Sequence, residues 1–256
     1  MTMHAAIDVR TAERGHRFYV GMAVVFVLIA FGGFIPTYWA KLATGTFDRP
    51  AIYHLHGFVL FSWTLFYFFQ TALVAAGRTL DHRSWGMLGI ALATAIGFTV
   101  TMTAITTMHI DDARGFGDAT RHFEAISFIG LAVFGTLFTL AIVNVRRPDW
   151  HKRLMILAMI PLMQAATARV FQTVLAPPGG GHNGPAPPVF VTIPPGIAVD
   201  LLIIVAMVYD WRTRGKVHPV YLAGLPFIIV TQLLVIPIAA SDAWMHTAAS
   251  LEKLMG

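Results

Sequence analysis

The sequence predicts an all-α integral membrane protein, a helical bundle of about seven transmembrane helices with a cytoplasmic N-terminus and an external C-terminus. Three observations predict this fold. Hydrophobic residues make up 56% of the 256 residues and charged residues only 12%, about half the share that is usual in soluble domains. Several apolar stretches are long enough to cross a bilayer, which takes roughly 20 helical residues. Basic residues concentrate in alternate loops, as the positive-inside rule requires.

The first apolar stretch follows Arg10, Arg14 and Arg17. It is longer than the apolar part of a signal peptide and no small-residue cleavage site follows it, so we interpret it as an uncleaved span. The predicted spans cover residues 18–36, 51–76, 84–108, 122–145, 152–176, 195–210 and 219–240. We therefore expect a cytoplasmic segment 1–17, one membrane domain 18–240 with a core at 50–176, and an external tail 241–256.

Local signals mark where several of these helices begin. Asp48, Asp81 and Asp118 precede the second, third and fourth spans, and Pro148 opens the fifth. These are residue types that favour the cap and first turn of a helix. The sixth span is the shortest and follows a Pro- and Gly-rich stretch, residues 176–195, which predicts an irregular outer loop that covers the helix ends as a lid.

The basic residues set the orientation. Twelve lie in one set of loops and five in the other, and Arg169 lies inside a span. The positive-inside rule places the richer set in the cytoplasm, so residues 212–216 are predicted to be cytoplasmic and residues 177–195 external. A bacterial inner membrane is the expected location.

The net charge of +5 and the pI of about 9.8 follow from this loop bias, so the lipid bilayer rather than nucleic acid is the expected partner. The chain has no cysteine. Thiolate-bound haem, iron–sulfur clusters, covalently attached haem and disulfides are therefore excluded.

Histidines are predicted at both faces of the membrane. On the outer side lie His54, His56, His109 and His122, with His182 and His246 beyond the spans, and on the inner side lie His82, His151 and His218. Ionisable residues at membrane depth are costly, so each is a candidate functional residue.

Helical periodicity separates the two histidines of the second span. His56 shares one face with Trp63, Tyr67 and Gln70, whereas His54 lies on the opposite, more apolar face. We expect His56 to point into the bundle and His54 to point toward lipid or a partner.

On the third span, His82 shares a face with Gly86 and Gly89. Small residues there permit either close helix packing or a flat prosthetic group against the backbone.

These motifs carry a resemblance. Histidines at the outer ends of the second and fourth spans, and at the inner ends of the third and fifth, make residues 50–176 similar to cytochrome b561. The motifs HLHGFVLFSWTLFYFFQ, DHRSWGMLG and DWHKRLM also resemble an uncharacterised group of bacterial multi-span membrane proteins. The first resemblance implies two b-type haems, an outer one held by His56 and His122 and an inner one held by His82 and His151. It also implies electron transfer across the membrane, with a quinone or a redox protein as partner, and Arg169 would neutralise a propionate.

Other interpretations remain open. The outer residues His54, His56, His109, His122 and Glu124 would suit a site for zinc, copper or iron. A transporter or structural subunit without a cofactor would use the same polar residues to relay protons or join helices. His82 and His151 each stand beside a basic residue, a setting in which histidine also contacts lipid headgroups. The sequence does not decide whether the protein is an enzyme.

Two charged residues are predicted to pair. Arg169 and Asp200 lie at about the same distance from the outer ends of consecutive spans. A lone charge at that depth costs on the order of 2–3 kcal/mol, so an Arg169–Asp200 ion pair is expected.

Overall fold

The structure, a computed structural model, describes residues 3–175 and 184–255. In that part of the chain every regular element is helical. Seven helices are long and apolar enough to cross a membrane, which confirms the predicted all-α membrane bundle. They are α1 (Met3–Gly33), α3 (Ala51–Ala75), α4 (Thr79–Asp112), α5 (Gly117–Val143), α6 (Pro148–Leu175), α7 (Ile193–Arg214) and α8 (Pro219–Ala239).

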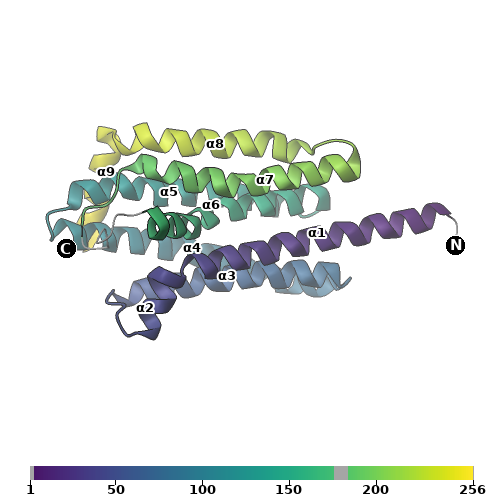
Figure 1. Ribbon diagram of the computed structural model, residues 1–256, viewed down its shortest axis with the longest axis horizontal. Coiled ribbons are helices and arrows are strands. Elements are labelled where there is room, and N and C mark those ends of the chain that lie inside the picture. Colours follow the sequence, from purple (N-terminus) through teal and green to yellow (C-terminus); the bar gives the residue numbers. More distant parts are fainter. Residues whose placement is uncertain (1–2, 176–183, 256) are drawn as a thin grey trace.

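The helices run side by side along one axis (Figure 1). Helix α1 packs on α3 and α6, α3 packs on α4, α4 on α5, and α5 on α6, so these five helices close a ring. Helix α7 packs on α6, and α8 packs on α5, α6 and α7. The start of α1 and helix α9 lie at opposite ends of the bundle (Figure 1), as an odd number of spans requires.

The centre of the ring is apolar and aromatic. Trp63 is only 2% exposed, and its indole N–H donates to the Met159 sulfur at 3.2 Å. Phe134 and Phe138 of α5 meet its ring edge-on, with centroids 5.5 and 5.4 Å away. Trp63, Tyr67 and Gln70 are all buried, so the predicted inner face of the second span is confirmed. Large apolar side chains on the outside of the bundle, such as Leu28 of α1, face the lipid.

The first span continues beyond the predicted residue 36. After α1 the chain enters a π-helical turn, Ile35–Trp39, and a short helix α2, Ala40–Ala43. Pro36 has no backbone N–H to donate, and the wider π-helical turn accommodates it.

The sixth span is also longer than predicted. A 3₁₀ turn, Val189–Thr192, leads directly into α7, whose first turn contains Pro194 and Pro195. Proline is tolerated in the first turn of a helix because the N–H it lacks would have no partner there. Of the predicted lid, residues 176–183 lie outside the described residues, and the 3₁₀ turn packs against α5, α7 and α8.

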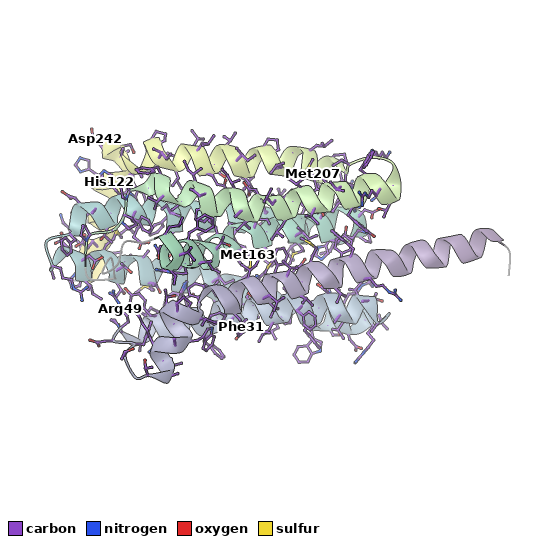
Figure 2. The ribbon with its side chains drawn as sticks, viewed as in Figure 1. Phe31, Arg49, His122, Met163, Met207 and Asp242 are labelled. Atoms are coloured by element: carbon purple, nitrogen blue, oxygen red, sulfur yellow. The ribbon has the colours of Figure 1, made fainter. Side chains whose placement is uncertain are left out.

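The expected external tail contains one more helix. Helix α9 (Asp242–Glu252) packs against α4 and α5 at the end of the bundle that is predicted to be external, hereafter the outer end, and is followed by a 3₁₀ turn, Lys253–Met255. The Ser241 hydroxyl accepts a hydrogen bond from the Trp244 backbone N–H at 3.3 Å and caps the N-terminus of α9. His122 and Asp242 lie at this end of the bundle, and Met207 lies toward the other (Figure 2).

Candidate functional site

Two of the predicted haem ligands meet at the end of the bundle that the loop charges predict to be cytoplasmic, hereafter the inner end. His82 is the fourth residue of α4 and His151 the fourth residue of α6. Their ring centroids are 6.3 Å apart, with the ring planes at 71°. The two helices are not consecutive in the chain, and the pair exists because α4 and α6 both pack on α5.

Hydrogen bonds fix the inner pair. Nδ1 of His151 lies 2.9 Å from the carbonyl oxygen of Ala141. Because a carbonyl only accepts, Nδ1 is the donor in this contact, and Nε2 is the ring nitrogen left to bind a metal ion. The Gln70 amide donates to the carbonyl of His82 at 3.2 Å and ties α3 to this end of α4.

Buried ring nitrogens without partners occur at two predicted ligands. Nδ1 of His82 and Nδ1 of His56 are both buried and have no hydrogen bond within the described part of the chain. Leaving a buried polar atom unpaired costs about 1–3 kcal/mol. Among the described histidines these two are the ones with such an atom, and they are predicted ligands of different haems.

The glycines beside His82 have different roles. A Cβ added to Gly89 would lie 3.0 Å from the Phe66 ring, so Gly89 permits close packing of α4 on α3. A Cβ added to Gly86 would meet nothing within 4 Å. There is therefore space for a flat prosthetic group against the backbone at Gly86, whereas Gly89 is occupied by the contact with Phe66.

The outer candidates are not gathered into one metal site. His122 contacts the carbonyl of Asp118 in its own helix through Nδ1 at 2.8 Å, and His109 is exposed. His54 was expected to face lipid or a partner, but its Nδ1 lies 3.1 Å from the Tyr38 hydroxyl. Within residues 3–175 and 184–255, no three His, Asp or Glu side chains converge as metal ligands would. His182 lies outside the described residues, and His246 is exposed on α9.

A smaller outer group does form around Arg169. Arg169 lies within electrostatic range of both Glu124 and His56. Glu124 accepts a hydrogen bond from Ser127, and Arg169 donates to Gln172 at 3.2 Å. Glu124 of α5 is therefore a buried carboxylate within electrostatic range of Arg169.

The predicted ion pair between Arg169 and Asp200 is not formed. No such pair occurs among the ion pairs of the described residues, and Asp200 instead accepts a hydrogen bond from Gln232 of α8 at 3.3 Å. The reason is the relative position of the two helices. Gln164 of α6 contacts Thr192 at the start of α7. From that level Arg169 lies five residues outward and Asp200 eight residues inward, an axial separation of roughly 20 Å at 1.5 Å per residue.

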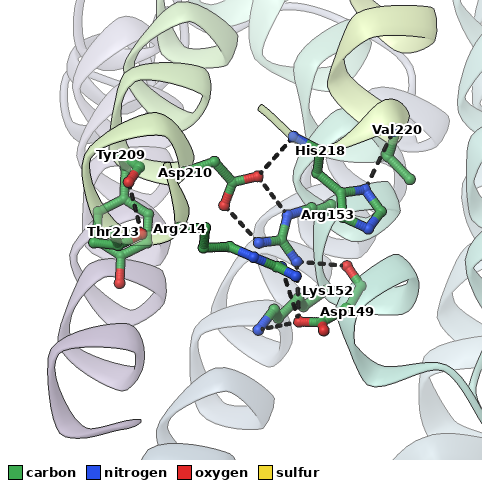
Figure 3. Close-up of polar contacts among 9 residues, drawn as sticks. All are labelled: Asp149, Lys152, Arg153, Tyr209, Asp210, Thr213, Arg214, His218 and Val220. Carbon is green, nitrogen blue, oxygen red and sulfur yellow. Dashed lines mark hydrogen bonds and ion pairs between the residues drawn. The ribbon is translucent and has the colours of Figure 1, made fainter. Parts of the chain in front are cut away.

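A buried ion pair joins α6 to α7 at the inner end instead. Arg153 is 1% exposed and Asp210 is 0% exposed. The Arg153 guanidinium donates two hydrogen bonds to the Asp210 carboxylate, one from Nε at 2.8 Å and one from Nη2 (Figure 3). Its third nitrogen donates to the backbone carbonyl of Asp149 at 2.7 Å and to the Asp149 side chain at 3.2 Å.

The sequence interpretation missed this pair. Arg153 was counted as a loop cation that determines topology, and Asp210 was not considered. Both residues lie at the inner ends of consecutive spans with opposite charges, which is the same signal that was used to pair Arg169 with Asp200.

His218 connects this ion pair to α8. Its backbone N–H donates to Asp210 at 3.3 Å, and its Nδ1 accepts from the Val220 N–H at 3.2 Å, so it caps α8 (Figure 3). Burial, followed by the positive charges of Arg153 and Arg214, lowers the pKa of His218 below its ordinary value of 6.5. The lowered pKa favours the neutral imidazole, whose Nδ1 can accept this hydrogen bond.

Comparisons of the chain with protein-family models, with curated proteins and with solved structures find no match.

Proposed function

We propose that this multi-pass membrane protein binds a b-type haem between His82 and His151 near its cytoplasmic face and carries electrons through it. The observation that carries the proposal is the pairing of these two imidazoles, whose ring centroids are 6.3 Å apart. The two ligands come from the first turns of α4 and α6, so the packing of the helices sets their spacing.

The distance suits one metal ion between two imidazoles. Metal–imidazole bonds are about 2 Å long, and a ring nitrogen lies roughly 1 Å from its centroid, so two imidazoles that share an ion have centroids roughly 6 Å apart. The hydrogen bonds of both histidines agree with a role as metal ligands. A ligating histidine usually donates its other ring N–H to a carbonyl or carboxylate, as Nδ1 of His151 does. Nδ1 of His82 is buried and has no hydrogen bond within the described residues.

Two ligands suit haem better than a bare metal. A protein-bound zinc ion takes three or four protein ligands, and the described residues bring no third His, Asp or Glu to this pair. Haem brings its own four nitrogens and needs only two axial ligands.

The chain's own residues would hold and tune the group. When bound, haem supplies reversible one-electron chemistry. Ala141 orients His151 through its carbonyl, and Gln70 fixes the start of α4. Arg83 is exposed beside His82 and would meet a propionate at the membrane surface.

Electron transfer across the membrane would require a second group at the outer end. His56 is the residue that supports one, because its Nδ1 is buried with no hydrogen bond to any described residue and Arg169 lies within electrostatic range. His122 is the predicted second ligand, and in this structure its Nδ1 contacts its own helix. We place the second haem at this pair as part of the proposal, with a quinone or a redox protein as the electron partner.

The test is an absorption spectrum of protein purified from haem-supplied cells, oxidised and reduced, together with haem counted as its pyridine complex. His82→Ala and His151→Ala should each remove the same spectral species, since bis-imidazole ligation fails when either ligand is lost. His56→Ala and His122→Ala should each remove a second species. His109→Ala, at an exposed position, is the control and should keep both.

A colourless wild-type protein, or an unchanged spectrum in both His82→Ala and His151→Ala, would show that the proposal is wrong. If only the inner species is found, the inner site stands and the transmembrane route does not.

A further inference from the structure

A small pocket with a few polar groups in a mainly apolar wall lies away from the histidines. It lies between α5, α6, α8 and the start of α7, and its volume of about 30 Å³ is enough for a water molecule or a small ion. Its polar lining comes from Gln164, Thr192, Thr231 and Gln232, and the remaining lining residues are apolar apart from Pro161 and Gly130.

The polar side chains that line the cavity keep acceptor oxygens with free lone pairs. Gln164 donates through its amide nitrogen to the Thr192 carbonyl, and Gln232 donates in the same way to Asp200. Thr192 and Thr231 donate their hydroxyl hydrogens to backbone carbonyls of their own segments. Both amide oxygens and both hydroxyl oxygens therefore retain lone pairs.

Gly196 allows the two glutamines to approach α7. A Cβ at Gly196 would lie 3.1 Å from Cδ of Gln232 and 3.2 Å from the amide nitrogens of Gln164 and Gln232. A side chain at this position would therefore push the two amides away from their present places. The two amides can therefore approach each other only because Gly196 has no side chain.

A buried carboxylate adjoins the cavity. Asp200 is 6% exposed, and only its Oδ1 has a hydrogen-bond partner, Gln232, in the described part of the chain. No Lys, Arg or His of that part lies within 4 Å of it in an ion pair. A carboxylate at membrane depth is costly unless it is neutralised, and oxygen ligands are those that hard cations prefer.

We propose that Asp200, Gln232, Gln164 and the hydroxyls of Thr192 and Thr231 form an intramembrane binding site for one sodium ion. The occupant is monovalent because a single carboxylate then balances its charge, whereas a divalent ion would leave a net charge in the membrane interior. The site is separate from the proposed haem ligands, because none of His56, His82, His122 and His151 lines the cavity.

The test uses the full-length protein in detergent, with NaCl exchanged for choline chloride at constant ionic strength. Sodium should raise the unfolding temperature saturably, because a ligand that binds only the folded state stabilises it. Radioactive sodium should bind once per chain. Asp200→Asn should abolish both effects, and Gly196→Ala should weaken sodium binding roughly ten- to hundredfold by displacing the amides.

Asp48→Asn is the matched control, because Asp48 is exposed in the turn before α3, and it should behave as wild type. If Asp200→Asn does not fold, Gln164→Leu replaces it and should lower sodium affinity in the same way. Equal unfolding temperatures in the two salts, with no sodium bound to the wild type, would overturn the proposal. That result would mean that a proton neutralises Asp200. Retention of sodium binding by Asp200→Asn would overturn it as well.

Discussion

At the scale of single residues, the least exposed charges in the structure lie at the inner end of α6 and α7. Arg153 and Asp210 satisfy each other through two hydrogen bonds, and Asp149 also binds Lys152 and Arg214. A buried pair of this kind adds little net stability, but removing one partner leaves the other charge unpaired. The pair therefore fixes how α6 and α7 meet.

Arg153→Leu and Asp210→Leu should each lower the free energy of unfolding by about 3–5 kcal/mol, since each leaves a buried charge unpaired. The double variant should recover much of that loss. Denaturant unfolding in detergent measures all three. The control is Arg78–Asp81, an exposed pair whose side chains are 64% and 45% accessible, where either substitution should cost less than about 1 kcal/mol. Simple addition of the two losses would contradict the pairing.

His218 predicts a pH dependence at the same end. Its folded-state pKa lies below 6.5, so as the pH falls through 6.5 the unfolded chain takes up the proton before the folded one. The folded state therefore loses stability on acidification, down to the folded pKa. His218→Asn keeps a residue that caps helices well and should flatten the fall in unfolding temperature below pH 6.5. An equal fall in His218→Asn and wild type would contradict this role.

At the scale of elements, the close approach of α1 to α6 decides how the first span joins the bundle. A Cβ built on Gly33 would overlap the backbone carbonyl of Ala166, whereas a Cβ on Gly32 would meet nothing within 4 Å. The two glycines are neighbours in the sequence, yet only Gly33 lies at the contact between the helices.

Gly33→Ala should destabilise the protein by about 1–3 kcal/mol, because the backbone of α6 cannot give way as a flexible side chain would. Gly32→Ala is the matched control and should be neutral or slightly stabilising, since alanine favours helix over glycine. Thermal unfolding of the two variants side by side measures the difference. Equal unfolding temperatures would show that α1 and α6 are not in this contact.

At the scale of the whole molecule, the orientation in the membrane remains a prediction from the loop charges. Reporter fusions at Lys216 and Gly184 should give opposite readings, with Lys216 cytoplasmic and Gly184 external. Lys216 follows α7 and Gly184 precedes it, so the two fusions test a single crossing. Matching readings would contradict the crossing, and a reversed pair would exchange the faces assigned to the histidines.

The sequence by itself determined the class of protein and the course of the chain. Residues 51–76 were predicted as one span and form α3, because burying some 20 apolar residues in lipid requires a helix whatever surrounds it. The inward face with Trp63 followed from helical periodicity alone. The histidines were found as candidates because ionisable residues are rare at membrane depth.

Tertiary structure decided which of those residues meet. His82 faces His151, Arg153 pairs with Asp210, and Asp200 contacts Gln232 rather than Arg169. Such contacts depend on how far each helix is shifted along its neighbour and on its rotation about its own axis. A shift of five or more residues moves a side chain by about 8 Å or more, which is beyond hydrogen-bonding reach. The apolar pattern of a span determines neither the shift nor the rotation, because the helix is equally well solvated by lipid in any of these positions. Close packing at glycines such as Gly33 and Gly196 selects one shift and one rotation.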